Sequence, residues 1–150
     1  MCAALVAACT QTQVPHIVGM ADLPLKTTEL PSDRWQEAPL RANAQHVLFG
    51  ANTNRERILR VGDYYFLRWY DAEPTKPMRI EFKYTQALTG ADVLTRTVEY
   101  NEPRETEGER KEQFHFSGAE RAKRGDIMTW KVDLYCNGQL VDSLQSYLWE

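Results

Sequence analysis

Alternation of apolar and polar residues through the second half of the chain predicts a series of short β-strands. Residues 78–87 alternate most strictly, and the apolar set that shares one face is Met78, Ile80, Phe82 and Tyr84. Period-two alternation is typical of a strand with one buried and one wet face. The run 64–70 is apolar on both faces except at Arg68, which predicts a central strand that is covered on both sides.

The C-terminal stretch 127–149 predicts a β-hairpin. Asn137-Gly138 separates two β-rich runs, and this dipeptide favours a type I′ turn because both residues tolerate positive φ. The first run alternates regularly and puts Cys136 on its apolar face. The second run is less regular, and a β-bulge near Asp142-Ser143 would reconcile its two faces.

Three further runs, 46–49, 93–100 and 113–116, bring the number of expected strands to about seven. Thr53 and Glu56 form a capping-box pattern followed by Gly62, which predicts a short helical turn near 54–61. Short strands with frequent turn signals favour an all-β, antiparallel immunoglobulin-like β-sandwich, with a small β-barrel as the alternative. Trp69 and Trp130 are expected to pack between the sheets, each with a partner for its indole N–H.

The first part of the chain differs in composition from the strand region. Residues 10–44 carry four of the seven prolines and show no sustained apolar period, which predicts an extended tether that ends before a sandwich domain over 45–150. Residues 1–9 resemble the end of a bacterial lipoprotein signal, with Val6-Ala7-Ala8 directly before Cys9. That resemblance implies lipidation of Cys9, with the true start of the signal lying upstream because no Lys or Arg precedes the box.

Several motifs between Phe49 and Trp149 are similar to those of a group of small uncharacterised bacterial envelope proteins. They are Arg55-Glu56-Arg57, Gly62–Trp69, Phe82–Ala87, Thr89-Gly90, Trp130-Lys131-Val132, Gly138–Val141 and Gln145–Trp149. The resemblance implies a shared sandwich domain and no particular chemistry. The expected location is periplasmic or anchored to the outer membrane, or cytoplasmic if Met1 is the true start.

The charges and reactive residues argue against several functional classes. A net charge of −3 and the lack of a basic stripe give no reason to expect a nucleic-acid partner. His16, His46 and His115 have no second ligand at metal-binding spacing, so no metal or other cofactor is expected. The mixed-charge stretch 101–111 is interpreted as a solvated loop. Arg68 is interpreted as the partner of a carboxylate or as a side chain that extends to the sheet edge, rather than as a ligand contact.

The function that the sequence favours is therefore a non-enzymatic module of the cell envelope. It would hold to the membrane through a lipid anchor and bind another envelope protein or itself. The alternative is a carbohydrate-binding module that stacks sugars on exposed aromatic residues. The residues considered for a binding surface are Trp35, Tyr64, Tyr70 and Trp149.

Overall fold

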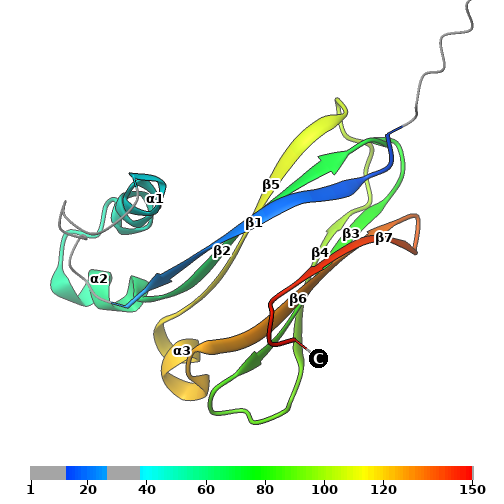
Figure 1. Cartoon of the computed structure of the whole chain (residues 1–150). Helices are drawn as coiled ribbons and strands as arrows, with labels where there is room; N and C mark the ends of the chain where they lie inside the picture. The colour runs from blue at the N-terminus through cyan, green and yellow to red at the C-terminus, as the bar shows by residue number, and fades with distance from the viewer. Residues whose placement is uncertain (1–12, 27–37, 150) are drawn as a thin grey trace, which may run out of the picture.

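A computed structural model describes residues 13–26 and 38–149, and it shows two antiparallel β-sheets packed face to face (Figure 1). The three-stranded sheet has the order β1-β2-β5, formed by β1 (His16–Leu25), β2 (Gly62–Asp71) and β5 (Gly108–Ser117). The four-stranded sheet has the order β4-β3-β6-β7, formed by β4 (Leu94–Tyr100), β3 (Met78–Gln86), β6 (Ile127–Cys136) and β7 (Gln139–Gln145).

This arrangement confirms the predicted all-β antiparallel sandwich of about seven strands. Across the described ranges the strands form two separate sheets, so they do not close into the alternative barrel. The fourth strand pairs with the third, whereas the corresponding strand of an antibody constant domain joins the other sheet. The predicted central strand, β2, lies between β1 and β5 as expected.

The main core lies between the sheets and is rich in aromatic side chains. Its buried residues include Leu67 and Trp69 from β2, Ile80 and Phe82 from β3, and Leu134 from β6. Trp69 is fully buried, and its ring centroid lies 5.5 Å from that of Tyr100. Trp130 packs at the margin of this core, half-buried. The expected partner for the Trp69 indole is missing, because its Nε1 has no hydrogen-bond acceptor among the described residues.

The C-terminal hairpin forms as predicted. Asn137 and Gly138 both adopt positive φ, 49° and 79°, which is the backbone that a type I′ turn requires. The irregularity in β7 lies slightly earlier than expected: Leu134 pairs with Asp142 and Tyr135 with Leu140, so Val141 is the extra residue. Cys136 is buried at the edge of the core.

The capping box is also confirmed, at the start of α2 (Asn54–Arg60). The Glu56 amide donates to Thr53 Oγ1 over 3.2 Å, and the Thr53 amide donates to Glu56 Oε2 over 2.9 Å. A second short helix, α3 (Gly118–Arg124), forms the connection between β5 and β6.

The predicted strand at 46–49 is wrong, because α1 (Ala38–Leu48) continues through most of it. A short apolar run has the same appearance in a strand and in a buried helix segment. The residues before it, with Pro39 in the first turn and alanines at 42 and 44, favour a helix. Ala44, Val47 and Leu48 form the apolar face of this helix.

The predicted tether over 10–44 is wrong where the structure describes it, because residues 16–25 form β1 and residues 38–44 begin α1. β1 pairs along its length with β2, from His16 opposite Tyr70 to Leu25 opposite Gly62. A register shift between Ile17 and Gly19 breaks its alternation, which hides the strand from a periodicity search. The domain therefore begins well before residue 45.

The stretch 101–111 is only in part the solvated loop that its charges predict: residues 101–107 form a loop in which all but Arg104 are exposed. Residues 108–111 belong to β5, and Arg104 is held by buried contacts. Its guanidinium forms an ion pair with Asp71 and donates to the carbonyl oxygens of Glu73 (3.0 Å) and Lys76 (2.7 Å). We call this set of contacts the Arg104 clamp. It joins the β4–β5 connection to the turn between β2 and β3.

Candidate functional site

The candidate site is a groove on the outer face of the three-stranded sheet, beside α1. It consists of two cavities of about 630 Å³ and 290 Å³ that share His46 and Gln113. Volumes of this size suit a side chain or a small organic ligand. We call it the sheet groove. Its lining comprises Ala21, Asn43, His46, Val47, Arg60, Tyr64, Phe66, Leu67, Arg68, Lys111, Glu112, Gln113, His115 and Ser117.

Helix α1 forms one wall of the groove because it covers only one end of the sheet. Its apolar face packs on Leu23, Leu25 and Tyr64, with Phe66 at the margin. Arg60, at the end of α2, secures this helix by donating from Nη1 to the carbonyl oxygens of Val47 (2.8 Å) and Phe49 (2.5 Å). A cationic side chain satisfies the free carbonyl groups that every helix C-terminus leaves.

The floor of the groove is built from directly paired residues of β2 and β5. Three successive outward-facing rows are Tyr64–His115, Phe66–Gln113 and Arg68–Lys111. In the first row the two rings stack with centroids 6.0 Å apart, and the Tyr64 hydroxyl donates to the Arg60 carbonyl over 2.6 Å. The rows therefore change from aromatic to polar to cationic along the strands.

Positive charge predominates in the groove. Lys111 is exposed and forms no ion pair within the described residues. Arg68 pairs with Glu109 over 3.6 Å, but both side chains are about half exposed, so this pair contributes little. The carboxylate partner expected for Arg68 is thus confirmed. Glu112 lies beside the groove on the opposite side of β5, and burial raises the pKa of its carboxyl group. The exposed lining is suited to an anionic ligand.

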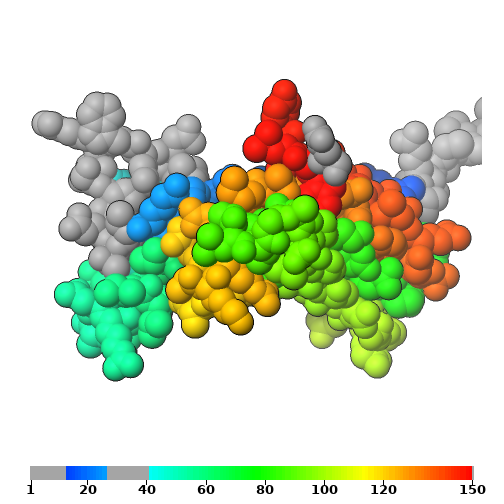
Figure 2. Space-filling view, turned by 90° about the horizontal axis from the view of Figure 1, so that it is seen from below, coloured from blue at the N-terminus to red at the C-terminus, as the bar shows by residue number. Residues whose placement is uncertain are grey.

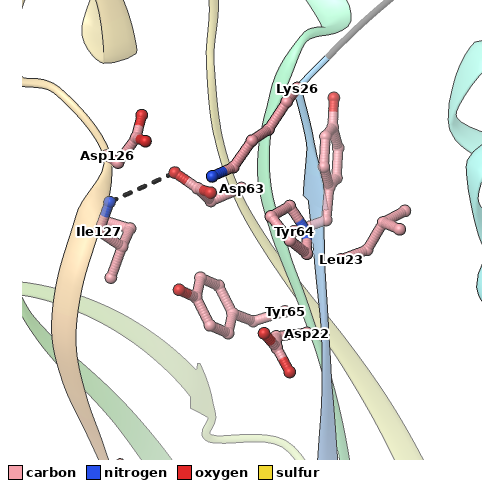
Figure 3. A pocket seen from close by; sticks show the side chains of 9 residues that line it. Asp22, Leu23, Lys26, Asp63, Tyr64, Tyr65, Asp126 and Ile127 are labelled. Carbon is pink, nitrogen blue, oxygen red and sulfur yellow. Dashed lines mark hydrogen bonds between the residues drawn. The ribbon is translucent and has the colours of Figure 1, made fainter. Parts of the chain in front are cut away.

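A third, smaller cavity, separate from the sheet groove, lies between the sheets at the end near α3 (Figure 3). It has a volume of about 150 Å³ and is lined by three carboxylates, Asp22, Asp63 and Asp126, with Lys26 beside Asp63. Burial raises the pKa of Asp63, and the Ile127 amide, which donates to Asp63 over 3.3 Å, opposes that effect. This hydrogen bond joins β2 to β6.

Cations within the protein already face the acids of this cavity. Arg121 lies 3.7 Å from Asp63 and 2.5 Å from Asp126, and Lys26 extends toward Asp63 in Figure 3. In the part of the chain that the structure describes, no group of three or more His, Cys, Asp or Glu side chains could hold a metal ion. The polar residues around this cavity are best explained as contacts that join the two sheets.

The structure does not bring the predicted binding residues together. Trp35 and the lipidation candidate Cys9 lie outside the described residues. Tyr64 is buried beneath α1, and Tyr70 stacks on His16 with ring centroids 5.4 Å apart. These two tyrosines are six residues apart on β2, about 20 Å at ordinary strand rise. Trp149 is half-buried and follows β7 on the other sheet.

Of the predicted binding residues the structure places Tyr64 alone in the lining of the groove, and sequence reasoning missed the others that line it. Arg68, Lys111, Gln113 and His115 form one surface only because β2 pairs with β5 in this register. Alternation marks which residues of a strand face outward, but it does not reveal which strands pair. His46 joins them because α1 lies over the sheet, and the sequence predicts a strand there.

Comparisons with known proteins leave the chain without an identified relative. No protein-family model matches it, and neither a curated protein nor a solved structure gives a match. None of the helices within the described ranges has the length and apolar character needed to cross a membrane.

Proposed function

We propose that the protein is a non-enzymatic binding module of the bacterial cell envelope that contacts another envelope protein through the sheet groove. The observation that carries this proposal is an open groove in which Lys111 forms no ion pair within the described residues and Arg68 has only a half-exposed acidic partner. Strand faces and the loops beside them are common contact surfaces of such domains. The opposite sheet face offers less, because Arg79, Glu81, Lys83, Lys131 and Asp133 pair with one another there.

A lipid on Cys9 would determine which end of the domain lies near the membrane. Cys9 precedes His16 by seven residues, which span at most about 25 Å. β1 starts at the end of the sandwich away from α1 and α2 (Figure 1). In Figure 2 the teal segment that contains α2 projects from the opposite end of the molecule. The α1 end of the groove would then face away from the membrane, in the periplasm or at the outer membrane.

The carbohydrate alternative has less support from the geometry. A sugar-stacking platform needs exposed aromatic rings that lie near one another. Tyr64 is buried and Tyr70 is covered on one side by His16. We therefore put forward protein binding as the function.

Site-specific photo-cross-linking in the native envelope tests the contact surface. A photoreactive residue at Gln113, which is exposed in the groove, should give one dominant cross-linked protein. The matched control is the same residue at Thr97, which is exposed on the outer face of the four-stranded sheet. Equal labelling from both positions, or none from either, would contradict the proposal.

Mass spectrometry of the protein isolated from its native cells tests the anchor. We expect a mature chain that starts at Cys9 and carries acyl chains, since lipoprotein processing cuts directly before the lipidated cysteine. A Cys9→Ser variant should lose both the cleavage and the membrane association. An intact, unmodified Met1 would rule the anchor out.

A further inference from the structure

The cationic row of the sheet groove is under repulsion that a ligand could relieve. Arg68 and Lys111 are direct cross-strand partners, and like charges in that position destabilise a sheet. Glu109 offsets the charge of Arg68 only weakly, because the two side chains are half exposed and 3.6 Å apart. An anion placed over this row would contact both cations.

A second positive centre lies at the other end of the groove. Arg60 lines the cavity beside Tyr64 and His115. Its guanidinium donates to neutral carbonyl groups, and it forms no salt bridge within the described residues. The groove therefore has positive charge at both ends.

Between the two centres the floor is less polar. Phe66 occupies the middle row, with Ala21 of β1 directly beside it. Phe66 is only partly buried by the residues of α1, so it leaves apolar surface in the groove. The groove thus has the cationic Arg68–Lys111 row at one end, the Phe66 ring in the middle, and Arg60 of α2 beside the aromatic Tyr64–His115 row at the other end.

Arg60 lies beside the Tyr64 row, and the spacing of the rows along β2 matches an extended polypeptide. The rows of Tyr64 and Arg68 are four residues apart on β2, about 13 Å, with Phe66 halfway. In an extended segment the side chains i, i+2 and i+4 lie on one face at the same intervals. A compact anion such as phosphate would reach only one end of such a groove.

We propose that the sheet groove binds an extended segment of the partner protein with the pattern acidic–x–apolar–x–acidic. The apolar side chain covers Phe66, and the two carboxylates face the Arg68–Lys111 row and Arg60. This assignment rests on the proposed function, because it names the kind of segment that the partner presents.

Binding of synthetic peptides to the full chain tests the assignment. The probe is a labelled peptide of about ten residues with Glu-Ser-Leu-Ser-Glu at its centre, followed by fluorescence anisotropy. We expect saturable binding that weakens at least about tenfold between low and high salt, because exposed charges are screened. A peptide with Lys in place of both Glu residues should not bind.

Charge-reversal variants locate the site. Arg68→Glu with Lys111→Glu should weaken peptide binding at least about tenfold, since both cations face the ligand. The matched control reverses Arg55 and Lys123, which are exposed on α2 and α3, and should bind within about twofold of the original protein. Circular dichroism and thermal melting establish that both double variants are folded.

Three results would overturn the inference. One is equal weakening by the two double variants. Another is equally tight binding of a peptide whose two Glu residues are adjacent, which would refute the spacing argument. The third is binding of anionic vesicles or oligogalacturonate, lost in Arg68→Glu/Lys111→Glu, without binding of the peptide. If Gln113 still cross-links to one protein, the groove remains the contact surface and only the acidic pattern is wrong; if it does not, the proposed function fails too.

Discussion

Replacing Arg104 with alanine should destabilise the fold strongly, because the Arg104 clamp is buried. Asp71 is fully buried at the end of β2, and the Arg104 side chain is only 8% exposed. Arg104 Nη2 lies 3.2 Å from Asp71 Oδ1, and its guanidinium also donates to two carbonyl groups of the β2–β3 turn. The substitution would leave the Asp71 carboxylate buried with only Arg110, 3.5 Å away, as a cationic partner.

The size of the destabilisation follows from the cost of leaving a buried charge without its partner. Removing one partner of a buried ion pair typically costs about 3–5 kcal/mol, a large share of the roughly 5–15 kcal/mol that keeps a domain folded. The remaining contact with Arg110 argues for the lower part of that range. We expect Arg104→Ala to lower the free energy of unfolding by about 3 kcal/mol and the melting temperature by roughly 10 °C.

Urea unfolding followed by tryptophan fluorescence measures this loss, with the slope against urea compared between proteins. Arg68→Ala is the control, because its ion pair with Glu109 is half exposed and should contribute less than about 1 kcal/mol. Asp71→Ala combined with Arg104→Ala should cost less than the sum of the single changes. If Arg104→Ala is no worse than Arg68→Ala, the argument for a buried clamp is wrong.

Three further variants test the turn, the close approach of β2 to β5, and the outer face of the four-stranded sheet. Gly138→Val should lower stability by about 1–2 kcal/mol because φ is 79° there, while Gly138→Asn should be tolerated; equal melting temperatures would contradict the turn. Gly62→Ala would place a Cβ 2.2 Å from the Phe116 carbonyl oxygen, whereas Gly19→Ala meets nothing within 4 Å, so calorimetry should show a loss of about 1–3 kcal/mol for the first only. Burial acts to raise the pKa of Asp133, but hydrogen bonds from Lys83 and Ser143 outweigh it and lower the pKa below the ordinary 3.8. A carboxyl group whose pKa is lower in the folded than in the unfolded protein stabilises the fold at pH values above its unfolded pKa, and this stabilisation is lost as the pH falls through the folded pKa. The loss of unfolding free energy in Asp133→Asn, measured by urea unfolding, should therefore be large at neutral pH and shrink below about pH 4. A loss that does not change with pH would refute this assignment.

Most of the sandwich could be predicted from local pattern, because its central strands follow simple rules. β3 alternates without interruption, β2 is apolar on both faces, and Asn137-Gly138 fixes the last hairpin. β1 was not predicted because a register shift interrupts its alternation of apolar and polar residues. The end of α1 was predicted as a strand because only its last three residues, with Phe49 directly after them, stand out as an apolar run in the sequence.

The groove and the clamp could not be predicted, since both depend on contacts between distant residues. Arg104 and Asp71 are 33 residues apart, and their pairing buries one side chain of a charged loop. Lys111 and Arg68 become neighbours only through the β2–β5 register. Tyr64 was considered for the binding surface although its strand is apolar on both faces; that α1 is the element that covers it depends on distant residues.

Arg96 closes the side of the sandwich where β4 and β5 lie next to each other. It donates to the His115 carbonyl over 2.6 Å, forms an ion pair with Glu120, and lies 4.2 Å above the Phe116 ring. An unpaired strand edge is a template for a further strand from another chain. By occupying a backbone acceptor on this edge, Arg96 obstructs the addition of a further strand at this position.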